Sequence, residues 1–143
     1  MRLRRSSKLM FHDPLTLVVA PNAQGQASGS IYMDDEITVA HGDARSYVWR
    51  ALSFDAKQGV LACGRRAESQ EEVSGSEDTY RPSNTVERIV IAGQSRAPVT
   101  ALLSTAAGAS QQLQVIFDEK FQTVTLKKPD VPIAEDWTIT FSY

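Results

Sequence analysis

The only cluster of side chains in this sequence that suggests catalysis is the acidic trio Asp34, Asp35 and Glu36. Two carboxyl groups that face one another can act as general acid and general base. Successive side chains of a β-strand point to opposite faces, so Asp34 and Asp35 cannot pair, whereas Asp34 and Glu36 could share a face. Nothing flanking the trio marks a pocket, and the trio ends an apolar run. We therefore interpret it as a turn whose carboxylates accept backbone N–H groups.

The remaining nucleophile and ligand types are isolated from one another. Cys63 ends an apolar run, which predicts a small buried hydrophobe rather than a reactive thiol. His12 and His41 lie in turn contexts, and no carboxylate or cysteine cluster stands at metal-ligand spacing. Glycine-rich phosphate-binding motifs are absent. The sequence thus predicts no catalytic, metal-binding or cofactor-binding residue.

Aromatic residues offer a different chemistry, because the C–H faces of a sugar stack on an aromatic ring. The candidates are Tyr32, Tyr47, Trp49 and Trp137. Tyr47, Trp49 and Trp137 stand inside alternating runs, which favours packing in a core. The orientation of Tyr32 stays open, since its apolar neighbours claim the opposite face. Tyr32, Trp49, Asp34 and Asp35 are the residues that we predict for contacts with a glycan or a protein interface.

Length and composition set limits on the class of protein. The 143 residues suit one domain, and one cysteine permits no internal disulfide. Basic and acidic side chains number 15 and 17, giving a net charge of −2. Nucleic acids and anionic membranes require a basic surface excess, so neither is expected as the main partner. No apolar run approaches the roughly 18 residues that a membrane-spanning helix needs.

Short apolar runs separated by Gly, Asn, Asp and Pro predict an all-β fold. We expect strands at 15–20, 30–34, 47–54, 60–63, 86–92, 98–105, 111–117, 122–128 and 136–143. The runs 47–54 and 60–63 are predicted to pair as a hairpin. The run 86–92 is predicted to be a central strand covered on both sides, and 129–135 to be a connector. In the last run, Trp137, Ile139, Phe141 and Tyr143 share one face. Eight or nine such strands predict an antiparallel two-sheet β-sandwich, with at most one turn of helix near 7–11.

Two segments differ from this pattern. Residues 1–12 are basic and read as a linker rather than as part of the sandwich at 13–143. Residues 66–84 are acidic and poor in apolar side chains, which predicts a mobile loop. The loop lacks the alternating oxygen ligands and the glycine of a calcium-binding loop, so we expect a solvated acidic segment.

Several blocks occur in an order and spacing that identify a family. The most distinctive are Gly29-Ser-Ile-Tyr-Met-Asp-Asp35, Val86-Glu-Arg-Ile-Val-Ile-Ala-Gly93, Lys127-Lys-Pro129 and Asp136-Trp137. Together they resemble the extreme C-terminal part of the family 31 α-glucosidases, and most closely the α subunits of glucosidase II. The resemblance covers nearly the whole chain.

The resemblance implies that residues 13–143 are a distal β-sandwich that follows a proximal sandwich and a catalytic (β/α)₈ barrel. The family hydrolyses terminal α-glucose of N-linked glycans with two carboxyl groups roughly 5–5.5 Å apart, and these belong to the barrel. The chain is therefore expected to be non-catalytic, a fragment or a stand-alone copy of the module. A stand-alone carbohydrate-binding sandwich is the alternative.

The resemblance also implies partners and a compartment. The expected partners are the upstream proximal sandwich, the barrel and the glucosidase II β subunit, and the expected compartment of the parent enzyme is the lumen of the endoplasmic reticulum. One departure concerns the acidic turn, where the family has Asp-Asp-Gly and this chain has Glu36. Glycine permits a positive φ that glutamate adopts only at a cost. Either the turn differs, or Asp35 takes the left-handed conformation.

Overall fold

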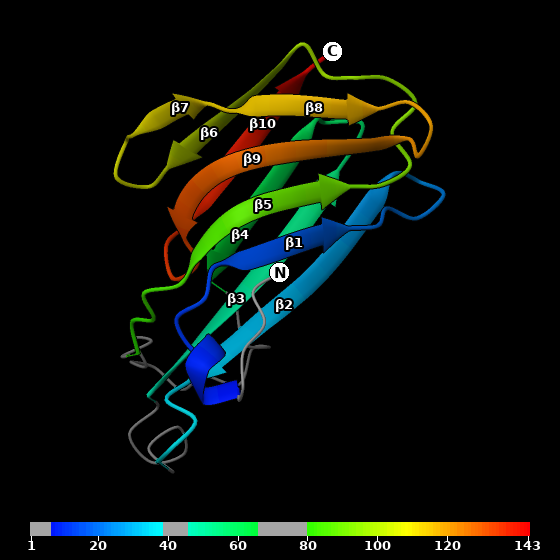
Figure 1. Ribbon diagram of the computed structural model, residues 1–143. Helices are drawn as coiled ribbons and strands as arrows, with labels where there is room; N and C mark the ends of the chain where they lie inside the picture. The colour runs from blue at the N-terminus through cyan, green and yellow to red at the C-terminus, as the bar shows by residue number, and fades with distance from the viewer. Residues whose placement is uncertain (1–6, 39–45, 66–79) are drawn as a thin grey trace.

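Two stacked β-sheets form the protein in the computed structural model, which describes residues 7–38, 46–65 and 80–143 (Figure 1). A short 3-10 helix, η1 (Ser7–Met10), precedes the strands, as expected. The strands are β1 (Leu15–Val19), β2 (Gln26–Asp34), β3 (Tyr47–Asp55), β4 (Val60–Arg65), β5 (Thr85–Ile91), β6 (Thr100–Thr105), β7 (Ser110–Gln112), β8 (Gln114–Asp118), β9 (Thr123–Pro132) and β10 (Trp137–Ser142). The predicted sandwich is confirmed, with ten strands in the described residues. No helix in these ranges is long and apolar enough to cross a bilayer.

The strand orders are β1-β5-β9-β8 in the four-stranded sheet and β2-β3-β4-β10-β6-β7 in the six-stranded sheet. The predicted hairpin is present, because β3 and β4 pair antiparallel with Leu52 opposite Cys63. One pair departs from the antiparallel expectation: β1 runs parallel to β5, with Leu17 opposite Ile89. Parallel neighbours need a long crossover, and the intervening strands of the other sheet supply it.

The run 111–117, predicted as one strand, is two strands in different sheets. β7 pairs with β6 in the six-stranded sheet, whereas β8 pairs with β9 in the four-stranded sheet. Between them Leu113 is 5% exposed, and its N–H donates to the carbonyl of Ala101 (2.8 Å). The alternating pattern could not reveal that the chain passes from one sheet to the other, because apolar side chains of both sheets face the same core.

The segment 129–135, predicted as a connector, is partly strand. β9 continues to Pro132 and pairs Val131 with Val86, after an irregularity opposite the residues between Val86 and Arg88 of β5. Lys128 and Asp130 take positive φ values of 50° and 47°, which lets the strand bend around the buried Pro129 and continue. The proline was a misleading stop signal, since a bulged strand tolerates it.

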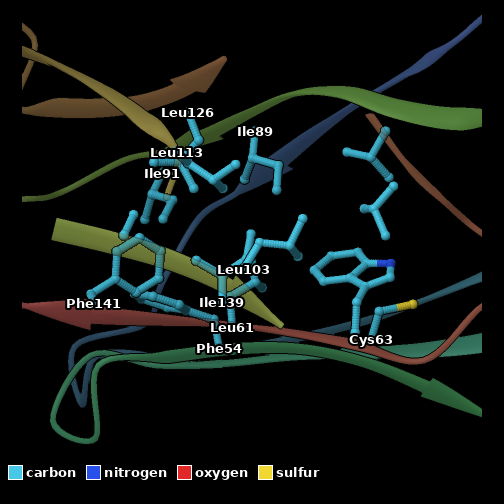
Figure 2. Close-up of a cluster of buried hydrophobic side chains, with 14 of the residues drawn as sticks. Phe54, Leu61, Cys63, Ile89, Ile91, Leu103, Leu113, Leu126, Ile139 and Phe141 are labelled. Atoms are coloured by element: carbon cyan, nitrogen blue, oxygen red, sulfur yellow. The ribbon is translucent and has the colours of Figure 1, made fainter. Parts of the chain in front are cut away.

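The space between the sheets holds the core (Figure 2). Ile89 and Leu126 point from the four-stranded sheet toward Leu61, Ile139 and neighbouring side chains of the six-stranded sheet. β10 buries Trp137, Ile139 and Phe141 as predicted, whereas Tyr143 follows the end of the strand and is 40% exposed. The burial of Cys63 is also confirmed.

The run 86–92 is central in its sheet, but it is not covered on both sides. β5 lies between β1 and β9. Its inner face is buried through Val86, Ile89 and Ile91, while Glu87 and Arg88 are exposed on the outer face. A two-layered fold covers each sheet once, so the prediction of two covered faces was wrong.

The buried Asn84 joins the segment before β1 to the start of β5. Its side-chain amide donates to the carbonyls of Phe11 (2.8 Å) and Asp13 (2.9 Å). The backbone carbonyl of Asn84 accepts from the N–H of Ile133 (3.1 Å), just after β9. Three segments that are distant in sequence are therefore tied together at one end of the four-stranded sheet.

The turn after β2 contains a strained residue. Glu36 has φ 54°, the left-handed conformation that the family's glycine would adopt freely. The glutamate itself carries the positive φ, an outcome that the sequence analysis did not foresee, and the alternative of a left-handed Asp35 was wrong.

Replacing Asn84 with alanine should lower the free energy of unfolding by about 1–3 kcal/mol, because two partly buried carbonyls lose their donor. Urea denaturation measures the change. The matched control is Ser83→Ala, which removes an exposed contact with His12 (3.2 Å) and should change stability by less than about 0.5 kcal/mol. Equal losses in both variants would contradict a specific role of Asn84.

Replacing Glu36 with glycine should raise the free energy of unfolding by roughly 1 kcal/mol, because the left-handed conformation loses its steric cost. The control Glu36→Gln removes the charge and keeps the strain, so it should not stabilise the chain. Thermal or urea unfolding of the two variants distinguishes strain from charge. A gain in the glutamine variant equal to that in the glycine variant would assign the effect to charge.

Candidate functional site

The acidic trio forms the turn at the end of β2. Asp34 accepts the N–H of Glu36 through Oδ1 (2.9 Å). Asp35 accepts the N–H groups of Ile37 (3.2 Å) and Thr38 (3.0 Å) through Oδ1, and its Oδ2 accepts the hydroxyl of Thr38 (2.7 Å). The interpretation of the trio as a turn that binds backbone N–H groups is confirmed.

Three aromatic rings stand next to this turn on the outer face of the six-stranded sheet. Tyr32 lies opposite Trp49 in the β2–β3 register, and Asp34 lies opposite Tyr47. The rings of Tyr32 and Tyr47 stack with centroids 5.4 Å apart and planes at 27°, while Trp49 meets Tyr32 edge-on at 6.1 Å. Tyr32 is 46% exposed. The structure thus brings together Tyr32, Trp49, Asp34 and Asp35, the four residues predicted for contacts.

The placement of Tyr47 and Trp49 in the core was wrong. The inner face of β3 is taken by the residues of the other parity, namely Val48, Arg50, Leu52 and Phe54. Since successive side chains alternate between the two faces of a strand, Tyr47 and Trp49 lie on the outer face of the sheet, where both are half-buried. Their aromatic type favoured a core position. The orientation of the strand was instead set by the alternate residues, such as Leu52 and Phe54, which face the core.

Two phenols near the turn are held in their neutral form. Partial burial, followed by the charge and hydrogen bond of Asp34, raises the pKa of Tyr32 above its usual value. Burial and then the charges of Asp35, Asp34 and Glu36 raise the pKa of Tyr80. Both hydroxyl groups therefore remain neutral donors and acceptors at physiological pH, beside a negatively charged turn.

The other candidate residues take structural positions. Cys63 is buried, and desolvation raises the pKa of its thiol, so a reactive thiolate is disfavoured. His12 contacts Ser83 and packs edge-on against Phe11 with ring centroids 4.9 Å apart. His41 lies outside the described residues, as does 66–79 of the predicted acidic loop. In the part of the chain that the structure describes, no three His, Cys, Asp or Glu side chains gather as metal ligands.

One polar site escaped the sequence analysis. Arg50 is 4% exposed at an inward position of β3 and forms an ion pair with Asp136. Arg50 Nε and the indole Nε1 of Trp137 are buried donors without a hydrogen-bond partner among the described residues. The available signal was the parity of Arg50, which it shares with Leu52 and Phe54. This arrangement belongs to the end of the core and adds no reactive group.

The arrangement of these side chains is suited to contact with another surface or with a sugar. It combines the exposed ring of Tyr32, one stacked and one edge-on aromatic neighbour, neutral phenols, and two carboxylates that accept backbone N–H groups. Such a surface can pack against another surface or stack on a sugar. The carboxylates of Asp34 and Asp35 hold the turn through the hydrogen bonds that they accept.

No protein-family model matches the chain, but individual relatives do. It is 32% identical over 139 residues to neutral α-glucosidase AB of Sus scrofa, covering 97% of this chain and 14% of that protein. Its fold is similar to the catalytic subunit in the endoplasmic reticulum glucosidase II heterodimeric complex (TM-score 0.77, 27% identity, 97% of this chain and 15% of that chain). A glucosidase II α subunit bound to Glc1Man2 gives a TM-score of 0.75 at 26% identity, covering 97% and 16%.

These matches confirm the resemblance drawn from the sequence blocks. They extend over nearly the whole of this chain, while the chain spans about 15% of the relatives' own length. The correspondence is therefore with one domain of much longer enzymes. The chain belongs, as a distal β-sandwich domain, to the glucosidase II-like α-glucosidases of glycoside hydrolase family 31.

Proposed function

We propose that this chain is a non-catalytic structural β-sandwich that supports the catalytic barrel of a glucosidase II-like α-glucosidase. The observation that carries the proposal is the asymmetry of the match, 97% of this chain against 14% of neutral α-glucosidase AB. Because the matched region is so small a part of that hydrolase, the catalytic residues are expected in the remainder of its polypeptide.

The arrangement of the carboxylates supports a non-catalytic role. Retaining hydrolysis needs two carboxyl groups roughly 5–5.5 Å apart across a sugar-binding cleft. The groove of about 440 Å³ beside the turns at 22–26 and 55–58 contains one carboxylate, that of Asp55. Hydrogen bonds from the Gln26 side chain and from backbone N–H groups, that of Gln58 foremost, lower the pKa of Asp55. It remains an ionised turn acceptor without a protonated partner.

The connector before β1 fits a domain junction. In this proposal residues 1–12 link the sandwich, residues 13–143, to a proximal sandwich. Asn84 holds the carbonyls of Phe11 and Asp13, so the last part of the connector has a fixed direction relative to the sheets. A fixed direction is what a supporting domain requires of its attachment.

The partners and the compartment follow from the same proposal. The upstream sandwich and the barrel are the partners within the enzyme. The glucosidase II β subunit is a further partner, supported by the similar structure of a catalytic subunit with the binding domain of its regulatory subunit. That complex is an endoplasmic reticulum enzyme, which supports the lumen of that organelle as the site of the parent protein.

Carbohydrate contact is a second candidate function, favoured by the exposed ring of Tyr32. The ring is 46% exposed and is held by stacking on Tyr47, so it is already ordered for contact. Trp49, Asp34 and Asp35 lie beside it, and could add a second ring and acceptor oxygens.

An antibody raised against the chain should remove α-glucosidase activity from an extract of the source cells, together with a polypeptide much larger than 15.7 kDa. Activity should follow the antigen because the sandwich is attached to the enzyme that it supports. The purified chain alone should not hydrolyse p-nitrophenyl α-glucoside. If the antibody detected only a 15.7 kDa polypeptide and all activity stayed in the extract, the structural role would be contradicted. If the purified chain hydrolysed the substrate and Asp34→Asn abolished that activity, the non-catalytic role would be contradicted.

Titration of the ¹⁵N-labelled chain with an α-1,3-linked glucose disaccharide separates the two candidate functions. A purely structural domain should give no chemical-shift changes. Carbohydrate contact would instead shift the amides around Tyr32 and Trp49, and Tyr32→Ala would remove the shifts while the chain stays folded. The control is Tyr143→Ala, which truncates another exposed ring, 40% exposed and distant in register, and should leave the titration unchanged.

A further inference from the structure

A polar groove lies beside the turns at 22–26 and 55–58, at one end of the paired strands β2 and β3. Its volume is about 440 Å³, and its polar lining comes from Asn22, Gln26, Ser28, Ser53, Asp55 and Gln58. This volume falls within the range that is usual for small-molecule sites. Tyr32 lies further along β2, about 20 Å from Gln26 at the usual rise of a strand. The polar groove is thus separate from the aromatic surface at the acidic turn.

Hydrogen bonds between backbone groups fix the walls of the polar groove. The N–H of Ala56 donates to the carbonyl of Gly25 (2.9 Å), which joins the two turns to each other. The N–H of Phe141 donates to the carbonyl of Gly59 (2.7 Å), which attaches the turn after β3 to β10. Only glycine permits this approach, because a Cβ at Gly59 would lie 2.7 Å from the carbonyl oxygen of Phe141. A ligand would therefore meet a preformed site, and little ordering of the protein would oppose its binding.

Two cross-strand pairs present their side chains to the polar groove. Gln26 lies opposite Asp55, and Ser28 lies opposite Ser53. The residues between them, Ala27 and Phe54, face the core, so these four side chains point to the outer face of the sheet. The polar groove therefore offers side-chain groups to a ligand.

Several of these side chains keep hydrogen-bonding groups that the turns do not use. Asn22 accepts the N–H groups of Gln24 (3.0 Å) and Gln26 (2.9 Å) through Oδ1, which leaves the two N–H groups of its Nδ2. Gln26 donates from Nε2 to Oδ2 of Asp55 (3.1 Å), which leaves its Oε1 as an acceptor. Oδ1 of Asp55 accepts two backbone N–H groups of the following turn. Its Oδ2 has a second lone pair for a further donor.

The charge of the lining limits the class of ligand. Asp55 is the one charged residue that lines the polar groove, and the hydrogen bond from Gln26, followed by that from the N–H of Gln58, lowers its pKa. The ionised carboxylate would repel an anion, and a metal ion prefers more oxygen ligands than a single carboxylate supplies. The other donors and acceptors are neutral. Hydroxyl groups match them, since each hydroxyl donates one hydrogen bond and accepts two.

We propose that the polar groove binds a pyranose sugar through adjacent hydroxyl groups of its ring. One hydroxyl would donate to Oδ2 of Asp55 and its neighbour to Oε1 of Gln26, two residues that are directly paired across the strands. Nδ2 of Asn22 would donate to a hydroxyl oxygen. The lining contains one carboxylate, whereas hydrolysis of a glycoside uses two, so the polar groove binds the sugar and leaves it intact. This site is additional to both candidate functions and independent of the contacts at Tyr32.

Titration of the ¹⁵N-labelled chain with methyl α-glucopyranoside tests the site. We expect saturable chemical-shift changes at the amides of Ser28, Ser53 and Gln58, with a dissociation constant in the millimolar range, and none at Tyr32 or Trp49. Tetrahydropyran-2-methanol has a ring of the same size without the ring hydroxyl groups. It should give no saturable change, because the polar side chains would have nothing to bind.

Asp55→Asn should weaken the binding of methyl α-glucopyranoside at least about tenfold, because it removes a charged acceptor of a hydroxyl group. The asparagine Oδ1 can still accept the backbone N–H groups of the turn. The matched control is Asp118→Asn, since Asp118 likewise accepts the N–H of Phe121 (3.1 Å) in the turn after β8, and affinity should be unchanged. Ser53→Val is a second variant, which leaves the turn intact and should weaken binding by replacing a hydroxyl with a larger apolar side chain.

Three results would overturn the proposal. The first is the absence of saturable changes at the amides of the polar groove. The second is unchanged affinity in folded Asp55→Asn, or in Ser53→Val where Asp55→Asn does not fold. The third is an equal response to tetrahydropyran-2-methanol. Changes confined to Tyr32 and Trp49 would also reject the polar groove while supporting carbohydrate contact at the aromatic surface, so the two sites are tested separately.

Discussion

The burial of one face of each sheet against the other is the constraint on which the rest of this structure depends. Trp137, Ile139 and Phe141 of β10 face a layer that contains Ile89 and Leu126 of the opposite sheet. Each such side chain contributes roughly 1.5–3 kcal/mol on burial. A shift of one residue in the pairing of any strand would turn its apolar side chains toward the solvent. The core between the sheets therefore fixes the register of every strand that contributes to it.

The same constraint explains where prediction from sequence succeeded and where it failed. The alternation in β10 and the hairpin of β3 and β4 follow from local patterns, and both were predicted. The crossing at Leu113 was not, because parity is preserved when a strand changes sheets. Pro129 ended a predicted strand that in fact continues, since two residues with positive φ beside it absorb the bend. Such a bend depends on the partner strand, which local sequence does not show.

Residue type and strand parity competed at the candidate site, and parity decided. Tyr47 and Trp49 are the residues that a small core would be expected to use, but Leu52 and Phe54 hold the inner face of β3. The consequence is an outer aromatic cluster and a buried Arg50 that must pair with Asp136. The residues predicted for contacts could be chosen individually from their chemistry. Their assembly beside the turn became visible only through the β2–β3 register.

Glu36 in the acidic turn and Gly29 in β2 are two positions where the residue type lowers local stability, for different reasons. At Glu36 the chain accepts a left-handed residue while neighbouring carboxylates hold the turn, so the strain is compensated within a few residues. At Gly29 nothing within the described chain compensates, because the missing side chain leaves open space rather than a contact. The sandwich therefore tolerates strain that is compensated locally and, at Gly29, space that the described residues leave open.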